Sequence, residues 1–461
     1  MLPARLCGRG STCSPALDIM LGMKPGQSIA ESADVAVVGA GPAGLMAAIA
    51  AAEAGRRVVV LEQLDRPGAK LLASGGGRCN LTNTLPREKF IARFGRQGRF
   101  MLPALAAMDS RALRQWLDGL GVPTHAPDGL HVYPVSDSAL TVQKALWRRL
   151  RELGAHVRLG VRVTGLWLED ATEKGTVPFS QRREKGTAPF SVLRGLETET
   201  GRVAAPHVIL AAGGRGYPSL GGSASGYELA RAAGHTIIGP TPALVPLRVK
   251  EPWVRRCAGA SLAAARIRID LAGESRAGLR GEALFTHAGL SGPAVLDLSG
   301  DVAALLARHK TVPLLVDLAP GVTPEDWRRR LEKWRTAEPR STVVSLLDRH
   351  LPKSLAAALA ELAGIGPALR PPQLSAGSRD RLTELLTALP LTVTGTEGWD
   401  RAMVTRGGVN LKEVDPRTLR SKRLAGLALA GELLDLDGPS GGFNLQWAFS
   451  SGYLAGKSIP G

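Results

Sequence analysis

The segment DVAVVGAGPAGLMAAIAAAEAGRRVVVLE, which runs from Asp34 to Glu62, decides the fold of this chain. An apolar run at 34–38 is followed by a glycine-rich turn, an alanine-rich stretch at 42–54 and a second apolar run at 57–62. The pattern predicts a buried strand, a helix that ends at Gly55, and a second buried strand. These elements form a βαβ unit, and such units build parallel sheets.

The turn between the first strand and the helix reads Gly39-Ala-Gly41-Pro-Ala-Gly44, which has the GxGxxG spacing of dinucleotide-binding folds. Gly39 would make the tight turn, Gly41 would let the backbone approach a pyrophosphate, and Gly44 would let the helix pack closely on the sheet. Free N–H groups at the helix N-terminus favour the negative charge of phosphates. Glu62 ends the second strand and can accept a hydrogen bond from a ribose 2′-hydroxyl, which argues against a 2′-phosphate at this site. The segment therefore predicts a bound dinucleotide.

The C-terminal part of the chain indicates which dinucleotide is bound. Gly431-Glu432 follows a predicted buried strand, and Asp437 lies in the loop after it. Flavoproteins of the two-dinucleotide-binding type place such a late strand and acidic loop near the ribityl chain and pyrophosphate of FAD. The run at 208–214 is similar to their middle strand. Because no second GxGxxG is present, a separate nicotinamide domain is not indicated, and FAD is the expected cofactor.

A second glycine-rich segment, LLASGGGRCNLTN at 71–83, follows the Glu62 strand. Three consecutive glycines cost backbone entropy and suit neither a helix nor a strand. A backbone free of side chains could lie against the flavin or its phosphates, and Ser74, Arg78 and Asn80 could form hydrogen bonds beside it. A glycine hinge with satisfied polar neighbours is the alternative interpretation.

Periodicity predicts further helices at 100–120 and 138–153, and strands at 155–169 and 192–210. The segment EKGTVPFS at 173–180 recurs as EKGTAPFS at 184–191 and reads as a duplicated loop without a chemical role. The expected fold class is α/β, a Rossmann-like FAD-binding domain of the two-dinucleotide-binding type with inserted β-rich and small helical domains. We expect the following division: an N-terminal extension, 1–32; the FAD-binding domain, 33–235 and 400–461, with a loop insertion at 173–191; the inserted β-rich domain, 236–322 and 389–399; and the inserted helical domain, 323–388.

The helical insert has a clear start signal. Thr323 can act as an N-cap, Pro324 suits the first helical position, and acidic side chains follow in the first turn. After the insert, a β-type pattern returns at 391–394, and the tail from 442 to 456 reads as a helix that closes the FAD-binding domain.

Composition limits the class of protein. The chain has 461 residues, a net charge of +17 and four cysteines. Its length predicts two or three domains. The basic residues form no long block and do not alternate with aromatic residues, so nucleic acid is not the partner we expect first. The cysteines form no CxxC pair, which suits a reducing cytoplasm, and no apolar run is long enough to span a bilayer. We therefore expect a cytoplasmic protein without membrane association.

Several longer blocks match one protein family. They are GAGPAGLMAA, ASGGGRCNLTN, HVYPVSDSA, LAAGGRGYPSLGGSASGYELARAAGH, LFTHAGLSGPAVL, VTRGGVNLKEVDPRTLRSK and AGELLDLDGPSGGFNLQWAFSSGYLAG, and they extend from about residue 33 to the end. In these blocks the chain resembles the BaiN-like (YhiN-like) family of FAD-binding flavoproteins, also catalogued as the aminoacetone oxidase family. The resemblance implies an FAD domain assembled from both ends of the chain, with the other two domains inserted. The N-terminal extension and the KGT repeat depart from the family.

The resemblance also implies which residues line the FAD. By correspondence with the family they are Gly39, Gly41, Pro42, Ala43, Gly44, Glu62, Gln63, Lys70, Ser74, Gly76, Gly77, Arg78, Cys79, Asn80, Val163, Gly213, Gly431, Glu432, Asp437, Gly441, Gly442 and Asn444. Among these, Val163 would lie on a strand beside the adenine.

Two side chains are candidates for catalysis. The flavin performs the redox step, and the protein supplies position and electrostatics. His287, in a glycine-rich turn, could act as an acid or base, with a structural histidine as the alternative. Arg78 could stabilise an anionic reduced flavin or a substrate oxygen, with a phosphate clamp as the alternative.

Other reactive side chains have milder interpretations. Cys79 has no partner cysteine nearby and reads as a buried inert thiol rather than a redox group. Tyr133 and Tyr217 could donate protons, with packing as the alternative. The eight histidines show no metal-ligand spacing, so no metal site is expected.

Three functions are in competition. The resemblance implies an FAD-dependent oxidoreductase that reduces an activated C=C bond, or a similar acceptor, in a small molecule, with NADH or NADPH as a transient donor. The second family name implies a flavin-dependent amine oxidase that uses oxygen, which the missing nicotinamide fingerprint favours. A flavin-containing RNA-binding or tRNA-modification factor is the third, which the net charge of +17 keeps open. The sequence assigns neither the substrate nor an oligomeric state.

Overall fold

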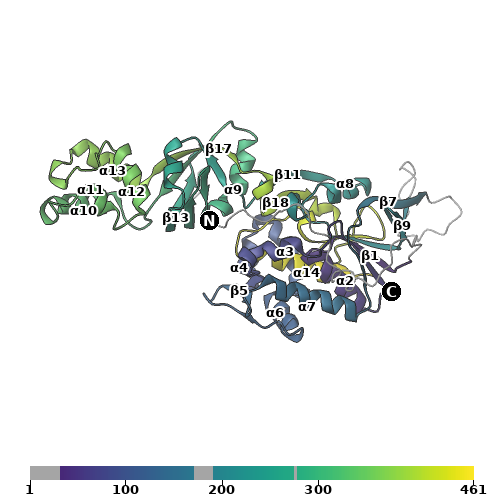
Figure 1. Ribbon diagram of the computed structural model, residues 1–461. Coiled ribbons are helices and arrows are strands. Elements are labelled where there is room, and N and C mark those ends of the chain that lie inside the picture. The colour runs from purple at the N-terminus through teal and green to yellow at the C-terminus, as the bar shows by residue number, and fades with distance from the viewer. Residues whose placement is uncertain (1–31, 171–190, 275–277, 461) are drawn as a thin grey trace, which may run out of the picture.

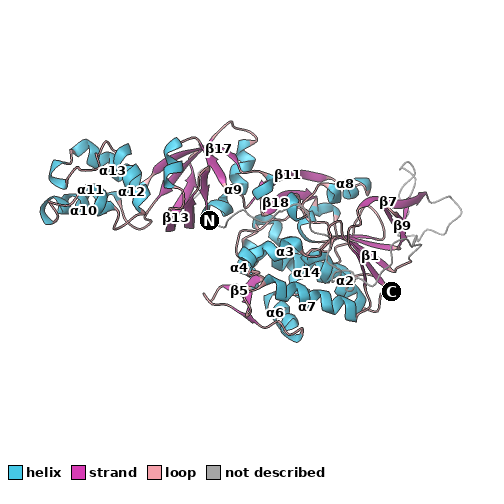
Figure 2. Cartoon of the chain, in the orientation of Figure 1, coloured by secondary structure: helices cyan, strands magenta, loops and turns pink. Residues whose placement is uncertain are grey.

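A computed structural model describes residues 32–170, 191–274 and 278–460 of the chain (Figures 1 and 2). The expected N-terminal extension, with Cys7 and Cys13, lies outside the described residues except at its last position. The duplicated KGT segment also lies outside them, apart from its final serine.

A five-stranded parallel sheet organises one half of the molecule. Across the sheet the strands are β19 (Leu427–Leu429), β10 (His207–Leu210), β1 (Val35–Val38), β2 (Val58–Leu61) and β6 (His156–Arg158). All residues of β1 and β2 are buried, which explains why both strands read as continuous apolar runs. The parallel sheet expected from the βαβ segment is confirmed, and its strands β1 and β19 come from opposite ends of the described chain.

Helix α2 (Pro42–Glu53) packs on this sheet, and helices α7 (Ala139–Glu152) and α14 (Phe443–Lys457) pack on α2 (Figure 1). The helices α2 and α14 approach closely because both present small residues. A Cβ on Gly452 would lie 2.2 Å from the carbonyl oxygen of Ala43, and one on Gly456 would lie 2.2 Å from that of Ala47. The alanine-rich composition of α2 therefore serves close packing between two helices that are almost 400 residues apart in the chain.

The segment between β2 and α7 forms a smaller layer. Its elements are α3 (Ala69–Ala73), the 3₁₀ turn η1 (Ser74–Gly77), β3 (Thr82–Asn83), α4 (Arg87–Ala92), η2 (Gly95–Met101), α5 (Leu102–Ala107), α6 (Ser110–Gly119), β4 (Thr124–His125) and β5 (His131–Pro134). The single helix expected at 100–120 is two helices, since Asp109 adopts an extended conformation and its side chain caps the Ala112 N–H at 2.9 Å.

A three-stranded antiparallel sheet packs against β10. It consists of β7 (Val163–Asp170), β8 (Ser191–Thr198) and β9 (Gly201–Ala204), and α8 (Ser225–Ala232) follows it. The chain then leaves this half of the molecule through β11 (Ile237–Ala243) and returns through β18 (Val404–Val409), and these two strands pair antiparallel.

The inserted β-rich part is a closed six-stranded barrel. Around the barrel the strands are β12 (Leu247–Val249), β15 (Gly289–Ser291), β14 (Leu279–Phe285), β13 (Ser261–Ile269), β16 (Val312–Asp317) and β17 (Leu389–Thr396). Helix α9 (Pro293–Leu306) packs against β14 and β11. The proposed division of the sequence assigns β11 to the β-rich domain, whereas in the structure β11 pairs with β18 and not with a barrel strand.

Helices α10 (Pro324–Ala337), α11 (Val343–Leu347), α12 (Lys353–Leu362) and α13 (Ala376–Thr387) occupy the far end of the molecule (Figure 2). The start of α10 is confirmed, because Thr323 and Asp326 form a capping box with Pro324 in the first turn. Trp327 and Leu331 belong to the same hydrophobic cluster as the inward residues of the barrel. The helices and the barrel therefore share one core, and we call them together the insert lobe, residues 244–396.

The molecule is elongated, with the insert lobe at one end and the parallel sheet at the other (Figure 1). We call the part with the parallel sheet the nucleotide lobe, residues 32–236 and 410–460, and the paired strands β11 and β18 join the two lobes. In the described ranges, no helix has both the length and the apolar character needed to cross a membrane.

Candidate functional site

A cavity of about 690 Å³, which we call the central cavity, lies at the carboxyl ends of β1, β2 and β10. Its walls come from the glycine turn after β1, from the 68–76 segment, from the 439–448 segment, and from side chains next to the insert lobe. Open parallel sheets bind ligands at this edge, so the fold places the cavity where a dinucleotide is expected.

The glycines of the fingerprint have different physical roles. Gly39 has φ of +98°, and a Cβ there would lie 2.7 Å from the Ala211 carbonyl oxygen. A Cβ on Gly44 would lie 1.9 Å from the Gly39 carbonyl oxygen, so the tight turn and the close helix packing both require glycine. A Cβ on Gly41 would meet no atom within 4 Å, because this residue faces the cavity.

Glu62 is buried at the cavity wall, and its carboxylate is already oriented by the backbone. One oxygen accepts the Ala40 N–H at 2.7 Å, and the other accepts the Leu64 N–H at 2.9 Å. A carboxylate has about four acceptor positions, so lone pairs remain for ribose hydroxyls.

The three consecutive glycines of the 71–83 segment all have positive φ, at 56°, 67° and 91° for Gly75, Gly76 and Gly77. Such a run of left-handed residues is open only to glycine at low cost. A Cβ on Gly76 would meet no atom within 4 Å, whereas one on Gly75 would lie 3.0 Å from the backbone nitrogen of Asn80. The segment is thus a tight turn that presents bare backbone to the cavity.

Asn80 and Lys70 place polar groups on the same wall. Asn80 Oδ1 is buried and has no hydrogen-bond partner among the described residues. Lys70 Nζ donates to Glu432 Oε2 at 2.7 Å, and Glu432 Oε1 accepts the Thr405 N–H at 2.8 Å. An unpartnered buried acceptor costs free energy unless a ligand or water supplies a donor.

These features fit FAD. At Gly41, Gly76 and Gly213 the space beside the backbone is open, and any larger side chain would enter it. Asn80 Oδ1 can accept a hydrogen bond from a donor such as a flavin ring N–H. We expect the glycine turn and Glu62 to hold the phosphates and ribose, and the 74–80 turn with Lys70 to hold the flavin end.

A histidine that sequence reasoning missed faces this cavity. His131 Nδ1 lies 2.5 Å from Asp128 Oδ2, and its Nε2 lies 3.0 Å from the place a Cβ would take on Gly441. The hydrogen bond from His131 holds the pKa of Asp128 well below its ordinary value, so that carboxylate remains ionised. The block HVYPVSDSA contains His131, but nothing in its local sequence marks this histidine as a residue of the site.

Most of the residues expected to line the FAD are on the cavity wall. They are Gly39, Gly41, Pro42, Ala43, Glu62, Gln63, Lys70, Ser74, Gly76, Asn80, Val163, Gly213, Glu432, Gly441, Gly442 and Asn444. Tyr133 and Tyr217 are also on the wall. Asn444 has a bracing role there, since its side chain exchanges hydrogen bonds with Gly438 and donates to the Pro439 carbonyl.

Several expected residues do not line the cavity. Gly44 and Gly77 are turned away, and Gly431 packs against α2, where a Cβ would lie 2.7 Å from that of Ala43. Cys79 is fully buried, and burial raises the pKa of its thiol to about 12. Cys79 is therefore a buried, unreactive thiol rather than a redox group.

Asp437 is also off the cavity wall, because it has a different partner. Its carboxylate accepts from Arg406 Nε at 3.1 Å, while Arg406 Nη1 bonds Asp301 of α9 at 2.7 Å. The acidic loop thus connects the two lobes, and Asp437 does not line the cavity. Sequence spacing could not reveal this contact, since Asp301 belongs to the insert.

The structure places neither catalytic candidate in the cavity. His287 is exposed on the turn between β14 and β15. Arg78 is half-exposed and pairs with Asp137 at 2.8 Å, and its guanidinium lies 4.3 Å from the ring centre of Tyr133. Arg78 therefore packs on Tyr133, which lines the cavity, and does not itself line the cavity.

A patch of apolar residues closes the cavity on the side of the insert lobe. It consists of Leu244, Pro293, Leu296, Met403 and Val404. These residues were not expected at the site, because single apolar residues in an inserted segment are indistinguishable from core residues. In the described part of the chain, no three His, Cys, Asp or Glu side chains converge as a metal site.

Comparisons with known proteins identify relatives of this chain. The family model described as the HI0933-like protein Rossmann domain matches residues 33–458. The chain is 35% identical over 430 residues to the 3-dehydro-bile acid delta(4,6)-reductase of Clostridium scindens, covering 92% of this chain and 98% of that protein. It is 30% identical over 442 residues to the ribosomal RNA dihydrouridine synthase of Escherichia coli, covering 93% of this chain and 98% of that protein. Among solved structures, 3-ketosteroid-delta4-(5alpha)-dehydrogenase from Rhodococcus jostii RHA1 aligns with a TM-score of 0.48 and 16% identity, over 93% of this chain and 97% of that chain.

Proposed function

The chain belongs to the HI0933-like Rossmann-domain family and is an FAD-dependent oxidoreductase. We propose that it reduces a C=C bond conjugated to a carbonyl group, with NADH or NADPH as the electron donor. The observation behind this proposal is the 35% identity to a reductase whose name specifies the delta(4,6) bonds of a 3-dehydro bile acid. In such a ring system the double bonds are conjugated to the carbonyl at C3.

The cavity suits this chemistry in two respects. One wall presents glycine backbone, Glu62 and Lys70, which are groups that bind a polar cofactor. The cavity also has an apolar patch with Leu244, Leu296 and Met403, which would accommodate a hydrophobic ring system. The substrate would thus lie between the cofactor and the insert lobe.

Reduction of such a bond adds a hydride to one carbon and a proton to its neighbour. FAD, when bound, supplies the hydride transfer. We assign the proton to His131, which lines the cavity and whose Nδ1 bonds the ionised Asp128. The Asp128 carboxylate fixes the orientation of the ring, and the ring would deliver the proton from Nε2.

A second candidate substrate is a uridine within RNA. The C5=C6 bond of uracil is conjugated to the C4 carbonyl, so its reduction is the same chemistry. Two observations favour it: the 30% identity to a ribosomal RNA dihydrouridine synthase, and the net charge of +17, which would attract a polyanion.

The test is product analysis under anaerobic conditions. FAD-loaded protein is mixed with NADH or, separately, NADPH, and then with a 4-en-3-one steroid or a uridine-containing ribosomal RNA fragment. We expect one donor to bleach the flavin, and one substrate to gain two hydrogens by mass spectrometry. If neither substrate gains hydrogen and the flavin turns over only with amines and oxygen, the amine oxidase alternative replaces this proposal.

A further inference from the structure

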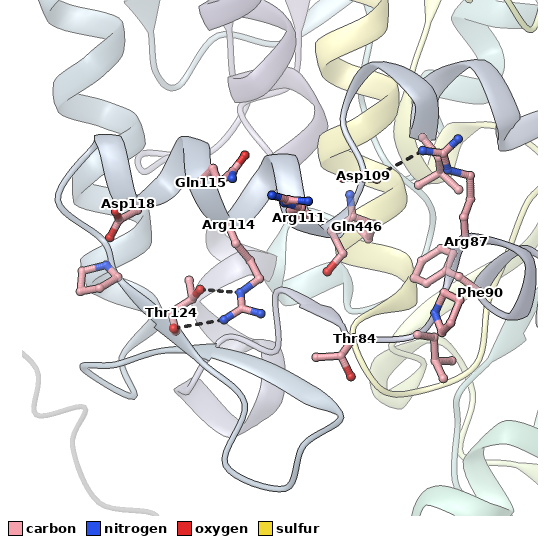
Figure 3. A pocket seen from close by; sticks show the side chains of 15 residues that line it. Thr84, Arg87, Phe90, Asp109, Arg111, Arg114, Gln115, Asp118, Thr124 and Gln446 are labelled. Carbon is pink, nitrogen blue, oxygen red and sulfur yellow. Dashed lines mark hydrogen bonds and ion pairs between the residues drawn. The ribbon is translucent and has the colours of Figure 1, made fainter.

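A second pocket lies apart from the central cavity, between α4 and α6 (Figure 3). We call it the arginine pocket, and its defining residues are Thr84, Arg87, Phe90, Arg111, Arg114 and Gln446. Its volume is about 630 Å³, and it shares no lining residue with the central cavity. Nothing in the proposed reaction uses it.

Gln446 leaves an unsatisfied acceptor in this pocket. The side chain is 1% exposed, and its Nε2 donates to the Met108 carbonyl at 3.1 Å and to Ser450 Oγ at 2.8 Å. Because a carbonyl can only accept, the amide nitrogen must face Met108, which fixes the orientation of the amide. Oε1 is then buried with no hydrogen-bond partner among the described residues. A buried acceptor in this state calls for an N–H or O–H donor from a ligand or water.

The arginines supply positive charge around the same space (Figure 3). Arg114 donates to Thr124 through Nε at 3.0 Å, which holds its guanidinium at the pocket wall and leaves other N–H groups available. Arg87 makes only a long contact of 3.4 Å to Asp109, whose other oxygen caps α6. Arg111 has no ion-pair or hydrogen-bond partner within the described ranges.

The pocket also offers apolar surface. Phe90 is buried and lines it together with Leu85 and Leu105. Asp109 and Asp118 also line the pocket, so its three arginines exceed its two carboxylates by one charge. A ligand that uses the arginines, the apolar surface and Gln446 needs an anionic group, an apolar body and a hydrogen-bond donor for Gln446 Oε1. A nucleotide has all three, because phosphate binds arginine in a forked geometry and each of the four common bases carries an N–H donor.

We propose that the arginine pocket binds one nucleotide, with its phosphate on Arg87, Arg111 and Arg114 and its base N–H on Gln446 Oε1. The nucleotide can be free or part of an RNA chain, since both present the same groups. The inference does not depend on the proposed reaction, because the pocket contains no residue of the central cavity.

The test is isothermal titration of the FAD-saturated protein with AMP, GMP, CMP and UMP, with inorganic phosphate, and with a short oligouridine. Saturation with FAD keeps the nucleotides out of the central cavity. The variants are Arg111→Gln, Gln446→Met and the control Arg151→Gln, an exposed arginine on α7 outside the pocket. We expect at least one nucleotide to bind, and Arg111→Gln and Gln446→Met each to weaken it about tenfold or more. Arg151→Gln should leave the affinity nearly unchanged.

Three results would overturn the proposal. They are the absence of saturable nucleotide binding, equal loss of affinity in Arg151→Gln and Arg111→Gln, and inorganic phosphate that binds as tightly as any nucleotide. Arg111 is exposed and supports no packing, so its variant remains informative even if Gln446→Met fails to fold. Tighter binding of oligouridine than of UMP, weakened by Arg111→Gln, would indicate RNA as the source; equal affinities would indicate a free nucleotide. Either pattern supports the pocket, whether or not a C=C bond is reduced.

Discussion

At the scale of single residues, the glycines around the central cavity divide into those required by packing and those required by empty space. Gly39 and Gly44 would clash with backbone atoms if they carried a Cβ. Gly41 and Gly213 would not, because their Cβ would enter the cavity. The sequence motif cannot distinguish the two groups, since both consist of glycine. Only substitutions of the second group, Gly41 and Gly213, test whether a ligand occupies the cavity.

Gly41→Val is the sharpest test of the cofactor site. Gly41 has φ of −75° and ψ of 179°, a conformation that valine adopts readily, so the fold should tolerate the change. The valine side chain would occupy ligand space and weaken FAD binding by about 1–3 kcal/mol, or roughly 5- to 150-fold. The measurement is a fluorescence titration of the apoprotein with FAD. Gly119→Val, at an open position outside the cavity, is the matched control. Equal affinity in both variants would refute the placement of the cofactor.

His131→Gln tests proton delivery. We expect turnover of the C=C substrate to fall by about 10²- to 10⁴-fold, the usual contribution of a general acid, while NAD(P)H still reduces the flavin at its normal rate. Asp128→Asn should lower turnover less, because it disturbs the orientation of the ring and leaves the imidazole in place. Stopped-flow measurement of the two half-reactions separates these effects. A His131 variant that is slow only in flavin reduction would exclude the proposed role.

Some residues of the site could be predicted from the sequence, and others could not. Glu62 and Asn80 line the cavity, and both could be selected from sequence because strand ends and glycine turns have local sequence signals. His131 was missed because its role depends on the approach of Gly441, over three hundred residues away. His287 and Asp437 were misplaced because the insert lobe turns one away from the site and engages the other through Arg406.

At the scale of elements, the strongly periodic segments were predictable. The helices at 42–53 and 139–152 and the strands around the fingerprint appear at the expected positions, since local composition and burial agree there. The pairing of β11 with β18 was not predictable, because register between segments more than 160 residues apart depends on tertiary packing.

Glu413 stabilises the chain at the ends of the paired strands β11 and β18 that adjoin the nucleotide lobe. Its carboxylate accepts the Thr236 N–H at 2.7 Å and is paired with Arg423 at 2.6 Å. Burial alone would raise its pKa, but the hydrogen bonds from Arg423 and Thr236 outweigh burial and lower it to about 2. The carboxylate therefore stabilises the fold above its ordinary pKa of 4.5, and this stabilisation is lost as the pH falls toward 2.

Glu413→Gln should consequently lower the free energy of unfolding by about 1.5–3 kcal/mol at neutral pH. The difference from the native protein should shrink as the pH falls from 4.5 toward 2, because in this range the unfolded chain takes up a proton at Glu413 while the folded chain does not. Urea denaturation at pH 7 and at the lowest pH where the protein stays folded measures both values. Glu228→Gln, an exposed carboxylate on α8, is the control. A gap that stays constant with pH would contradict the assignment.

At the scale of the whole molecule, the central cavity is completed only when both lobes are in place. The nucleotide lobe supplies the glycine wall, and Pro293 and Leu296 of α9 supply part of the apolar patch. The lobes are held by polar contacts next to the cavity: Arg406 bridges Asp301 and Asp437, and Asp297 accepts the Ser440 N–H at 2.7 Å.

Arg406→Gln should loosen this junction. Removing the guanidinium leaves the Asp437 carboxylate without its cation, a loss of about 1.5–3 kcal/mol, and we expect kcat/KM to fall by roughly tenfold or more while FAD content is unchanged. Steady-state kinetics and the flavin-to-protein absorbance ratio are the measurements. Arg401→Gln, which removes only a surface pair with Glu397, is the control. Unchanged kinetics in Arg406→Gln would show that lobe position does not affect the site.

The order of the segments along the chain could be predicted from sequence at this scale, since helical and strand patterns change abruptly near Thr323. The shared core of the barrel and the helices could not, because nothing in the local pattern of Trp327 indicates which apolar surface covers it. The arginine pocket was equally invisible, since Gln446 and Arg111 meet only through the packing of α14 near α6.

The measurement that tests the central claim most directly is anaerobic reoxidation of the reduced flavoprotein. The FAD-loaded protein is reduced photochemically, and one equivalent of a 4-en-3-one steroid, or of uridine-containing RNA in a parallel sample, is added. We predict that one of the two restores the flavin absorbance and yields an equivalent of product with a saturated C=C bond. A flavin that stays reduced with both, and recovers only when oxygen is admitted, would contradict a reductase of conjugated C=C bonds.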